Sequence, residues 1–230
     1  MRRSLPIAVA LALAICGCVN AADESTDNDA DGASATRVNG SIQVPNGAQR
    51  SDLSTVNGSI RVGNAATIAA AHTVNGAITL GARSKAASLR TVNGPITLDP
   101  GAQVSATVES VNGALTLHDE AQVTGSLMNV NGVIELTAAH VGGGLQTVNG
   151  DVTLSGASHV DGGILVKRPS GSHNFEDRIP RIVIGPGTTV AGSLRFEREV
   201  KLYVSDRATI GAVTGATPIR FSGERAPLDL

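Results

Sequence analysis

The motif Val-Asn-Gly occurs seven times in this chain at a nearly constant interval, and this repetition constrains the fold more than any other feature. Successive copies are separated by 18, 18, 18, 19, 19 and 18 residues, with asparagines at Asn39, Asn57, Asn75, Asn93, Asn112, Asn131 and Asn149. A fixed period of this length is typical of solenoids, in which one turn cannot bury its own apolar side chains and must stack on its neighbours. The repeat therefore predicts a stack of similar turns.

Within each repeat, the apolar residues follow the spacing of short β-strands. The motif valine is followed by an aliphatic residue four positions on and another six positions on, as in Val148, Val152 and Leu154. The last two flank a polar residue, which is the period of a strand with one buried face. Turn-forming residues such as Asp99-Pro100-Gly101 follow. We predict an all-β fold: a single-stranded parallel β-helix, or β-solenoid, of about nine turns of 18–20 residues, with the right-handed form favoured.

In such a stack, equivalent residues of successive turns lie over one another. The motif asparagines are then expected to form a turn ladder of amide side chains along one edge. A second polar ladder is expected at the position two residues before each asparagine: Thr55, Thr73, Thr91, Ser110, Asn129 and Thr147. Glycine suits the turn because it tolerates a positive φ angle. The alternative is a series of hairpin turns in an antiparallel sheet, but the constant period favours the solenoid.

The first 18 residues have the features of a lipoprotein-type signal peptide. Arg2 and Arg3 precede an apolar stretch, residues 5–15, that is too short to span a bilayer as a helix. The sequence Ile15-Cys16-Gly17-Cys18 then resembles a bacterial lipobox, whose last cysteine is acylated. We therefore predict lipidation of Cys18 and a membrane partner through this N-terminal lipid anchor.

The residue after the predicted lipid-bearing cysteine bears on the compartment. Val19 is not the aspartate associated with inner-membrane retention in lipoproteins, so the resemblance implies the outer membrane, on its periplasmic or surface side. The alternative is ordinary signal cleavage after Ala21 or Ala22, which would give a soluble periplasmic or secreted protein.

Composition divides the rest of the chain into three parts. Residues 19–36 are acidic and contain no Lys or Arg. This composition predicts a disordered tether. The solenoid is expected over residues 37–213, with a polar loop insertion at 167–180 where the repeat is interrupted. Residues 214–230 are expected to form a C-terminal cap or tail.

Charge and aromatic content argue against nucleic acid as a partner. The formal net charge is −2, no basic stripe is present, and aromatic residues make up only 2% of the chain. Binding of nucleic acid usually requires basic patches and aromatic stacking platforms. We predict no nucleic-acid partner.

Two parts of the sequence have residues of the kinds that bind metal ions. Asp27 to Gly32 imitate the start of an EF-hand calcium loop, but Val38 stands where the loop needs a bidentate glutamate. His140 and His159 precede equivalent valines, so they should stack on neighbouring turns about 4.8 Å apart, in a row that continues with glutamines. Two imidazoles can share a zinc ion, but the sequence showed no third ligand. We predict no metal site and no cofactor.

Two segments resemble known families. The octapeptide from Thr147 to Leu154 resembles the repeat of bacterial adhesin-like β-solenoid domains. The segment from Ile184 to Leu194 is similar to turns of bactofilins, which are polymer-forming cytoskeletal β-helix proteins. The resemblance implies a solenoid over residues 37–213 and either an adhesive or a polymer-forming role. The export signal departs from the bactofilin pattern, whose members are largely cytosolic.

The aligned turns predict no catalytic residues. β-Helical enzymes that act on polysaccharides place several carboxylates or basic groups together on one face. The outward position after the first strand aliphatic instead holds mostly threonine: Gln43, Arg61, Thr79, Thr97, Thr116, Glu135 and Thr153. We therefore predict that the chain is not an enzyme.

Together, these features predict a non-enzymatic cell-envelope lipoprotein that acts as a structural or adhesive β-solenoid scaffold. Its expected partners are the membrane and an envelope glycan or protein. One alternative is a polymer-forming, bactofilin-like protein that self-associates through its terminal turns. A second alternative is a polysaccharide-acting β-helix enzyme.

Overall fold

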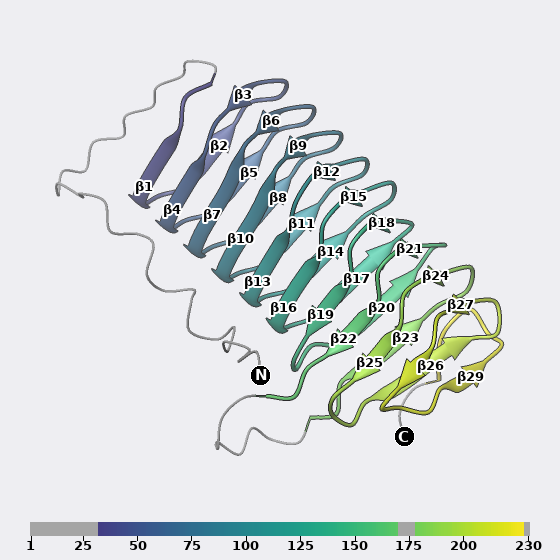
Figure 1. Cartoon of the computed structure of the whole chain (residues 1–230). Coiled ribbons are helices and arrows are strands. Elements are labelled where there is room, and N and C mark those ends of the chain that lie inside the picture. Colours follow the sequence, from purple (N-terminus) through teal and green to yellow (C-terminus); the bar gives the residue numbers. More distant parts are fainter. Residues whose placement is uncertain (1–31, 170–177, 228–230) are drawn as a thin grey trace, which may run out of the picture.

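A computed structural model describes residues 32–169 and 178–227, and these form a parallel β-solenoid (Figure 1). The predicted signal peptide, most of the tether and the centre of the loop insertion lie outside the described residues. The described residues contain no helix, and hence none that is long and apolar enough to cross a membrane. Each full turn contributes one strand to each of three sheets, which we call sheets A, B and C.

The strands of each sheet follow the order of the chain. Sheet A contains β1 (Ala35–Asn39), β4 (Leu53–Asn57), β7 (Ala70–Asn75), β10 (Ser88–Asn93), β13 (Val108–Asn112), β16 (Leu127–Asn131), β19 (Leu145–Thr147), β22 (Ile164–Val166), β25 (Leu194–Phe196) and β28 (Val213–Thr214). Sheet B contains β2 (Ile42–Val44), β5 (Ile60–Val62), β8 (Ile78–Leu80), β11 (Ile96–Leu98), β14 (Leu115–Leu117), β17 (Ile134–Thr137), β20 (Val152–Ser155), β23 (Arg181–Ile184), β26 (Lys201–Ser205) and β29 (Ile219–Phe221). Sheet C contains β3 (Gln49–Arg50), β6 (Thr67–Ile68), β9 (Lys85–Ala86), β12 (Gln103–Val104), β15 (Gln122–Val123), β18 (His140–Val141), β21 (His159–Val160), β24 (Thr189–Val190) and β27 (Thr209–Ile210).

All pairs of neighbouring strands are parallel, and equivalent residues of successive repeats are paired. In sheet A, for example, Asn39 pairs with Asn57, Asn57 with Asn75, and Asn75 with Asn93. The predicted all-β solenoid is thus confirmed, and the antiparallel hairpins that were the alternative are excluded for these repeats.

The stack has about ten turns, one more than the sequence pattern indicated. Sheets A and B each have ten strands, because β28 and β29 continue the stack beyond residue 213. Around the insertion, β22 ends at Val166 and β23 begins at Arg181, and Ile182 of β23 pairs directly with Val152 of β20. The extra residues therefore interrupt the sequence repeat without interrupting the pairing of the strands.

One continuous core of stacked aliphatic side chains fills the interior of the solenoid. Rows of Ile, Leu and Val run along the stack, and Ile60, Ile78 and Ile96, which pair in register, are fully buried. Like residues touch like residues because neighbouring strands are only about 4.8 Å apart. A second, small cluster of Val183, Tyr203 and Phe221 lies outside this core.

Most of the motif positions need glycine because successive turns approach each other too closely for a Cβ. A positive φ angle is a reason for glycine at only two of them. Among them, only Gly40 and Gly132 have a positive φ. At Gly58, an added Cβ would lie 2.0 Å from the carbonyl oxygen of Gly40 in the preceding turn, and Gly76 and Gly94 have the same geometry. The positive φ for which glycine was expected to suit this turn is therefore found in two of the seven copies.

Candidate functional site

The motif asparagines form a continuous ladder of side-chain hydrogen bonds along the corner between sheets A and B. Each Nδ2 donates to the Oδ1 of the asparagine in the preceding turn, at 2.8–3.0 Å. Because every bond runs in the same direction, the free acceptor of the ladder is at its C-terminal end, on Asn149. There Nη1 of Arg198 donates to Asn149 Oδ1 at 2.5 Å and to the carbonyl of Val148 at 3.2 Å. The guanidinium of Arg198 thus supplies the hydrogen bond that a further motif asparagine would donate to Asn149.

A second ladder, two residues before each asparagine, faces the interior. Thr55, Thr73 and Thr91 are fully buried, and their hydroxyls donate to the carbonyls of the motif glycines in the preceding turn at 3.0–3.1 Å. Ser110 and Asn129 make the equivalent bonds. Since a buried polar group without a partner is costly, these bonds explain how a threonine row is accommodated beside an aliphatic core. Both ladders are structural, because nearly all of their hydrogen bonds go to one another and to the backbone; among these side chains Asn129 Oδ1 is buried without a partner.

The outer face of sheet B carries the polar row that the sequence predicted. Its members pair in register: Gln43, Arg61, Thr79, Thr97, Thr116, Glu135 and Thr153. At its N-terminal end an open groove of about 500 Å³ is lined by hydrogen-bonding side chains that include Gln43, Asn46, Arg61, Asn64, Thr79 and Asp99. This groove can form many hydrogen bonds with a polar ligand.

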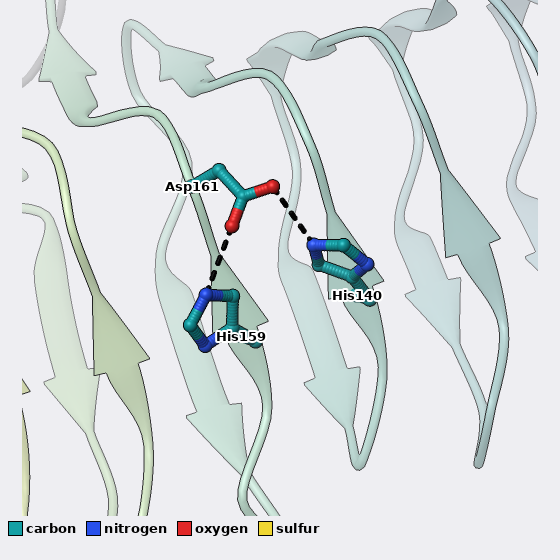
Figure 2. A group of neighbouring side chains, drawn as sticks. All are labelled: His140, His159 and Asp161. Atoms are coloured by element: carbon teal, nitrogen blue, oxygen red, sulfur yellow. Dashed lines mark hydrogen bonds and ion pairs between the residues drawn. The ribbon is translucent and has the colours of Figure 1, made fainter.

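Sheet C brings together the one group of side chains that could hold a metal ion among the described residues. His140 of β18 pairs with His159 of β21, as the sequence predicted, and their ring centroids lie 5.4 Å apart. The carboxylate of Asp161 lies between them: Oδ2 is 3.0 Å from Nε2 of His140, and Oδ1 is 2.9 Å from Nε2 of His159 (Figure 2). All three side chains are exposed.

Asp161 is the third possible metal ligand, and the alignment of the repeats did not identify it. It follows His159 by two positions, so the alternation of the strand directs both side chains to the same outer face. In the preceding turn the equivalent position is Gly142, which has no side chain. The hydrogen bond from His140 is the main cause that lowers the pKa of Asp161, with a weaker, opposing effect of desolvation.

A separate electrostatic feature lies on the outer face of sheet A. His72 pairs with Ser54 on one side and Arg90 on the other, and Arg90 forms an ion pair with Glu109 at 3.2 Å. Partial burial lowers the pKa of His72, Arg90 lowers it further, and Glu109 opposes the shift. The position therefore favours a neutral imidazole.

Cys18, the predicted site of lipidation, lies outside the described residues. Comparison with protein-family models, with curated proteins and with solved structures found no match to this chain. The class of the protein is thus defined by its fold, a parallel β-solenoid, and the adhesin-like and bactofilin-like resemblances stay predictions.

Proposed function

We propose that this chain is a non-enzymatic scaffold of the bacterial cell envelope, a lipid-anchored β-solenoid with a structural or adhesive role. The observation that carries this proposal is the unbroken in-register stack, in which every turn from Gln43 to Thr153 places a polar side chain in one outer row and threonine fills three successive positions, Thr79, Thr97 and Thr116. A stack of this kind presents evenly spaced hydrogen-bonding groups, which suits contact with another extended, repetitive polymer.

The anchor is tested by a pair of cysteine variants. The chain would be expressed in a bacterium with an outer membrane, labelled with an alkyne-bearing fatty acid, and its mass measured after extraction with detergent. Cys18→Ser is expected to abolish labelling and release the protein from the membrane fraction, whereas Cys16→Ser keeps both, since only Cys18 stands at the acylated position of the lipobox. Labelling that survives Cys18→Ser would contradict the proposed anchor.

For the adhesive role, we propose an envelope glycan as the partner of the groove on sheet B. The detergent-extracted chain is expected to co-sediment with purified peptidoglycan sacculi. Thr79→Arg places a long side chain in the groove and should reduce the bound fraction at least about fivefold, a loss of roughly 1 kcal/mol. Thr209→Arg, an exposed threonine of sheet C, is the matched control and should bind like the unchanged protein. Equal binding by both variants would exclude the groove as the glycan site.

A second candidate function is end-to-end polymerisation. The two large hydrophobic side chains that are exposed among the described residues lie in the first and last strands: Val38 of β1 is 44% exposed and Ile219 of β29 is 47% exposed. Within residues 32–169 and 178–227, no strand pairs with the outer edge of β1 or of β29, and such an edge favours addition of another chain. Sedimentation velocity of the extracted chain over a hundredfold range of concentration tests this candidate, and a monomer at every concentration would rule it out.

A further inference from the structure

We propose that His140, His159 and Asp161 form a binding site for a divalent transition-metal ion, with Zn²⁺ as the ion to test. The two imidazoles and one carboxylate are ligand types that zinc takes in proteins, and nitrogen donors of this kind favour Zn²⁺, Cu²⁺ or Ni²⁺ over Ca²⁺ and Mg²⁺, which prefer oxygen. This site is independent of the scaffold function and of the groove on sheet B.

Two of the three distances between the donor atoms are close to those around a bound ion. The ligand atoms of all three residues lie within 4.8 Å of one another, and the two contacts between imidazole nitrogen and carboxylate oxygen are 2.9 and 3.0 Å. With metal–ligand bonds of about 2.0–2.1 Å, ligands around one ion are separated by roughly 2.9–3.4 Å. A metal ion can therefore replace the hydrogen-bonded protons between Asp161 and the histidines with small side-chain rotations.

The backbone holds the three residues in place before any ion binds. His140 and His159 are on paired strands, and the amide of Asp161 donates to the carbonyl of Val141 at 2.9 Å. The ordering cost of bringing the ligands together is thus met mainly by the fold, which favours affinity.

The site faces solvent, and this determines what it can bind. Since all three side chains are exposed, an ion can enter directly, and water completes its coordination at the positions that the protein leaves open. Three protein ligands with open positions are the arrangement in which a further ligand from another molecule can also bind the ion. We therefore expect an exchangeable ion rather than a buried structural one.

The row in which the histidines lie supplies variants that should preserve the fold. Gln103 and Gln122 occupy the same row in the two preceding turns, so His140→Gln and His159→Gln extend an existing row of glutamines. Thr124 occupies the position of Asp161 two turns earlier, which makes Asp161→Thr equally conservative. The matched control is His118→Gln, which removes an exposed histidine from a turn between sheets B and C.

Isothermal titration with ZnCl₂ of the full chain, extracted with detergent and stripped with EDTA, tests the site. One ion is expected per chain, and each of the three variants should weaken its affinity at least about tenfold, while His118→Gln leaves it unchanged. Far-UV circular dichroism verifies that each variant retains its strands. Absence of saturable binding, or a single site whose affinity none of the three variants reduces, would overturn the proposal.

A spectroscopic measurement identifies the ligands directly. The electron paramagnetic resonance spectrum of the chain with one equivalent of Cu²⁺ is expected to show coupling to two imidazole nitrogens. One coupling should disappear in His140→Gln and one in His159→Gln, whereas His118→Gln keeps both. A copper spectrum without nitrogen coupling, or one that the first two variants do not change, would assign the ion to carboxylates elsewhere and contradict the site.

Discussion

At the scale of single residues, the motif glycines determine how closely successive turns approach one another. Gly76, Gly94 and Gly113 each lie against the backbone of the glycine one turn earlier, with no space for a Cβ. The threonine that precedes the motif valine then reaches a carbonyl of that glycine from inside. The two residues thus act together, because the short distance that glycine allows is also the one that the hydroxyl needs.

Gly94→Ala tests this close approach in the middle of the stack. Its Cβ would lie 2.0 Å from the carbonyl oxygen of Gly76, so the two turns must separate and lose packing. We expect the free energy of unfolding to fall by about 1–3 kcal/mol or more, measured by urea denaturation. Gly223→Ala is the control, since its Cβ meets no atom closer than 3.5 Å, and it should change stability by less than about 0.5 kcal/mol. Similar losses in both variants would contradict this account.

The end of the asparagine ladder offers a second test at the same scale. Arg198 donates to the last acceptor, Asn149 Oδ1, and the energy of this contact can be isolated with a double-mutant cycle of Arg198→Met and Asn149→Ala. We expect a coupling of about 1 kcal/mol in the free energy of unfolding, because the donor is charged and the contact is partly buried. A cycle of Arg195→Met with Glu197→Gln, an exposed ion pair at 3.2 Å, should show a smaller coupling. Additive effects of Arg198→Met and Asn149→Ala would show that the arginine does not stabilise the ladder.

At the scale of strands, the repeat in the sequence is sufficient to predict which strands pair. Since Asn57, Asn75 and Asn93 recur every 18 residues, aligning them also aligns the aliphatic rows, and the pairs in sheet B follow. The burial of Thr55 could not be inferred from residue type, because threonine is usually exposed and the partner of its hydroxyl is a backbone group of another turn.

Two other features were not predicted from the sequence, because they depend on residues outside the repeat positions that were aligned. Asp161 joins the histidines from a position two residues further along the strand, and aligning only the histidine row does not show it. The alternation in His159-Val160-Asp161 was a signal that could have revealed it. The last turn, with β28 and β29, was missed because it lacks the Val-Asn-Gly motif and its spacing.

A pH-dependent prediction belongs to the outer face of sheet A. Because the pKa of His72 is lowered in the folded protein, the unfolded chain binds a proton there first as the pH falls below about 6.5. Protonation of His72 then favours the unfolded state. The free energy of unfolding therefore decreases as the pH falls, until the pH is also below the lowered pKa of His72 in the folded state. Stability should therefore fall from pH 7.5 to pH 5.0, and part of this fall should disappear in His72→Gln.

Urea denaturation of both proteins at several pH values measures this contribution. His118→Gln, which removes an exposed histidine from a turn between sheets B and C, is the control for replacing a histidine by glutamine. The contribution assigned to His72 would be refuted by identical pH profiles of the unchanged protein and His72→Gln.

At the scale of the whole molecule, stability is a sum over neighbouring turns. Among the described residues, each strand pairs only with strands of the turns before and after it, so no strand pairing joins the two ends of the stack. Proteins of this architecture can lose terminal turns while the others remain folded. The C-terminal turns have an additional stabilising cluster, in which Phe221 packs with Val183 and Tyr203 on the outer face of sheet B, and Arg181 lies 4.7 Å from the ring of Tyr203.

The single tyrosine makes this arrangement measurable. The chain has one Tyr and no Trp, so tyrosine fluorescence reports the surroundings of Tyr203 in β26, whereas far-UV circular dichroism reports all strands. Phe221→Ala removes a ring that covers Tyr203 and should cost up to about 3–5 kcal/mol in the C-terminal turns. In thermal unfolding, the fluorescence transition is therefore expected at a lower temperature than the loss of strand signal.

Ile60→Ala changes a buried residue of β5 and should have the opposite effect. Strand signal is lost first, while Tyr203 keeps its folded fluorescence, because the destabilised turn is far from Tyr203 along the stack. Coincident transitions in both variants would show that the solenoid unfolds as one cooperative unit.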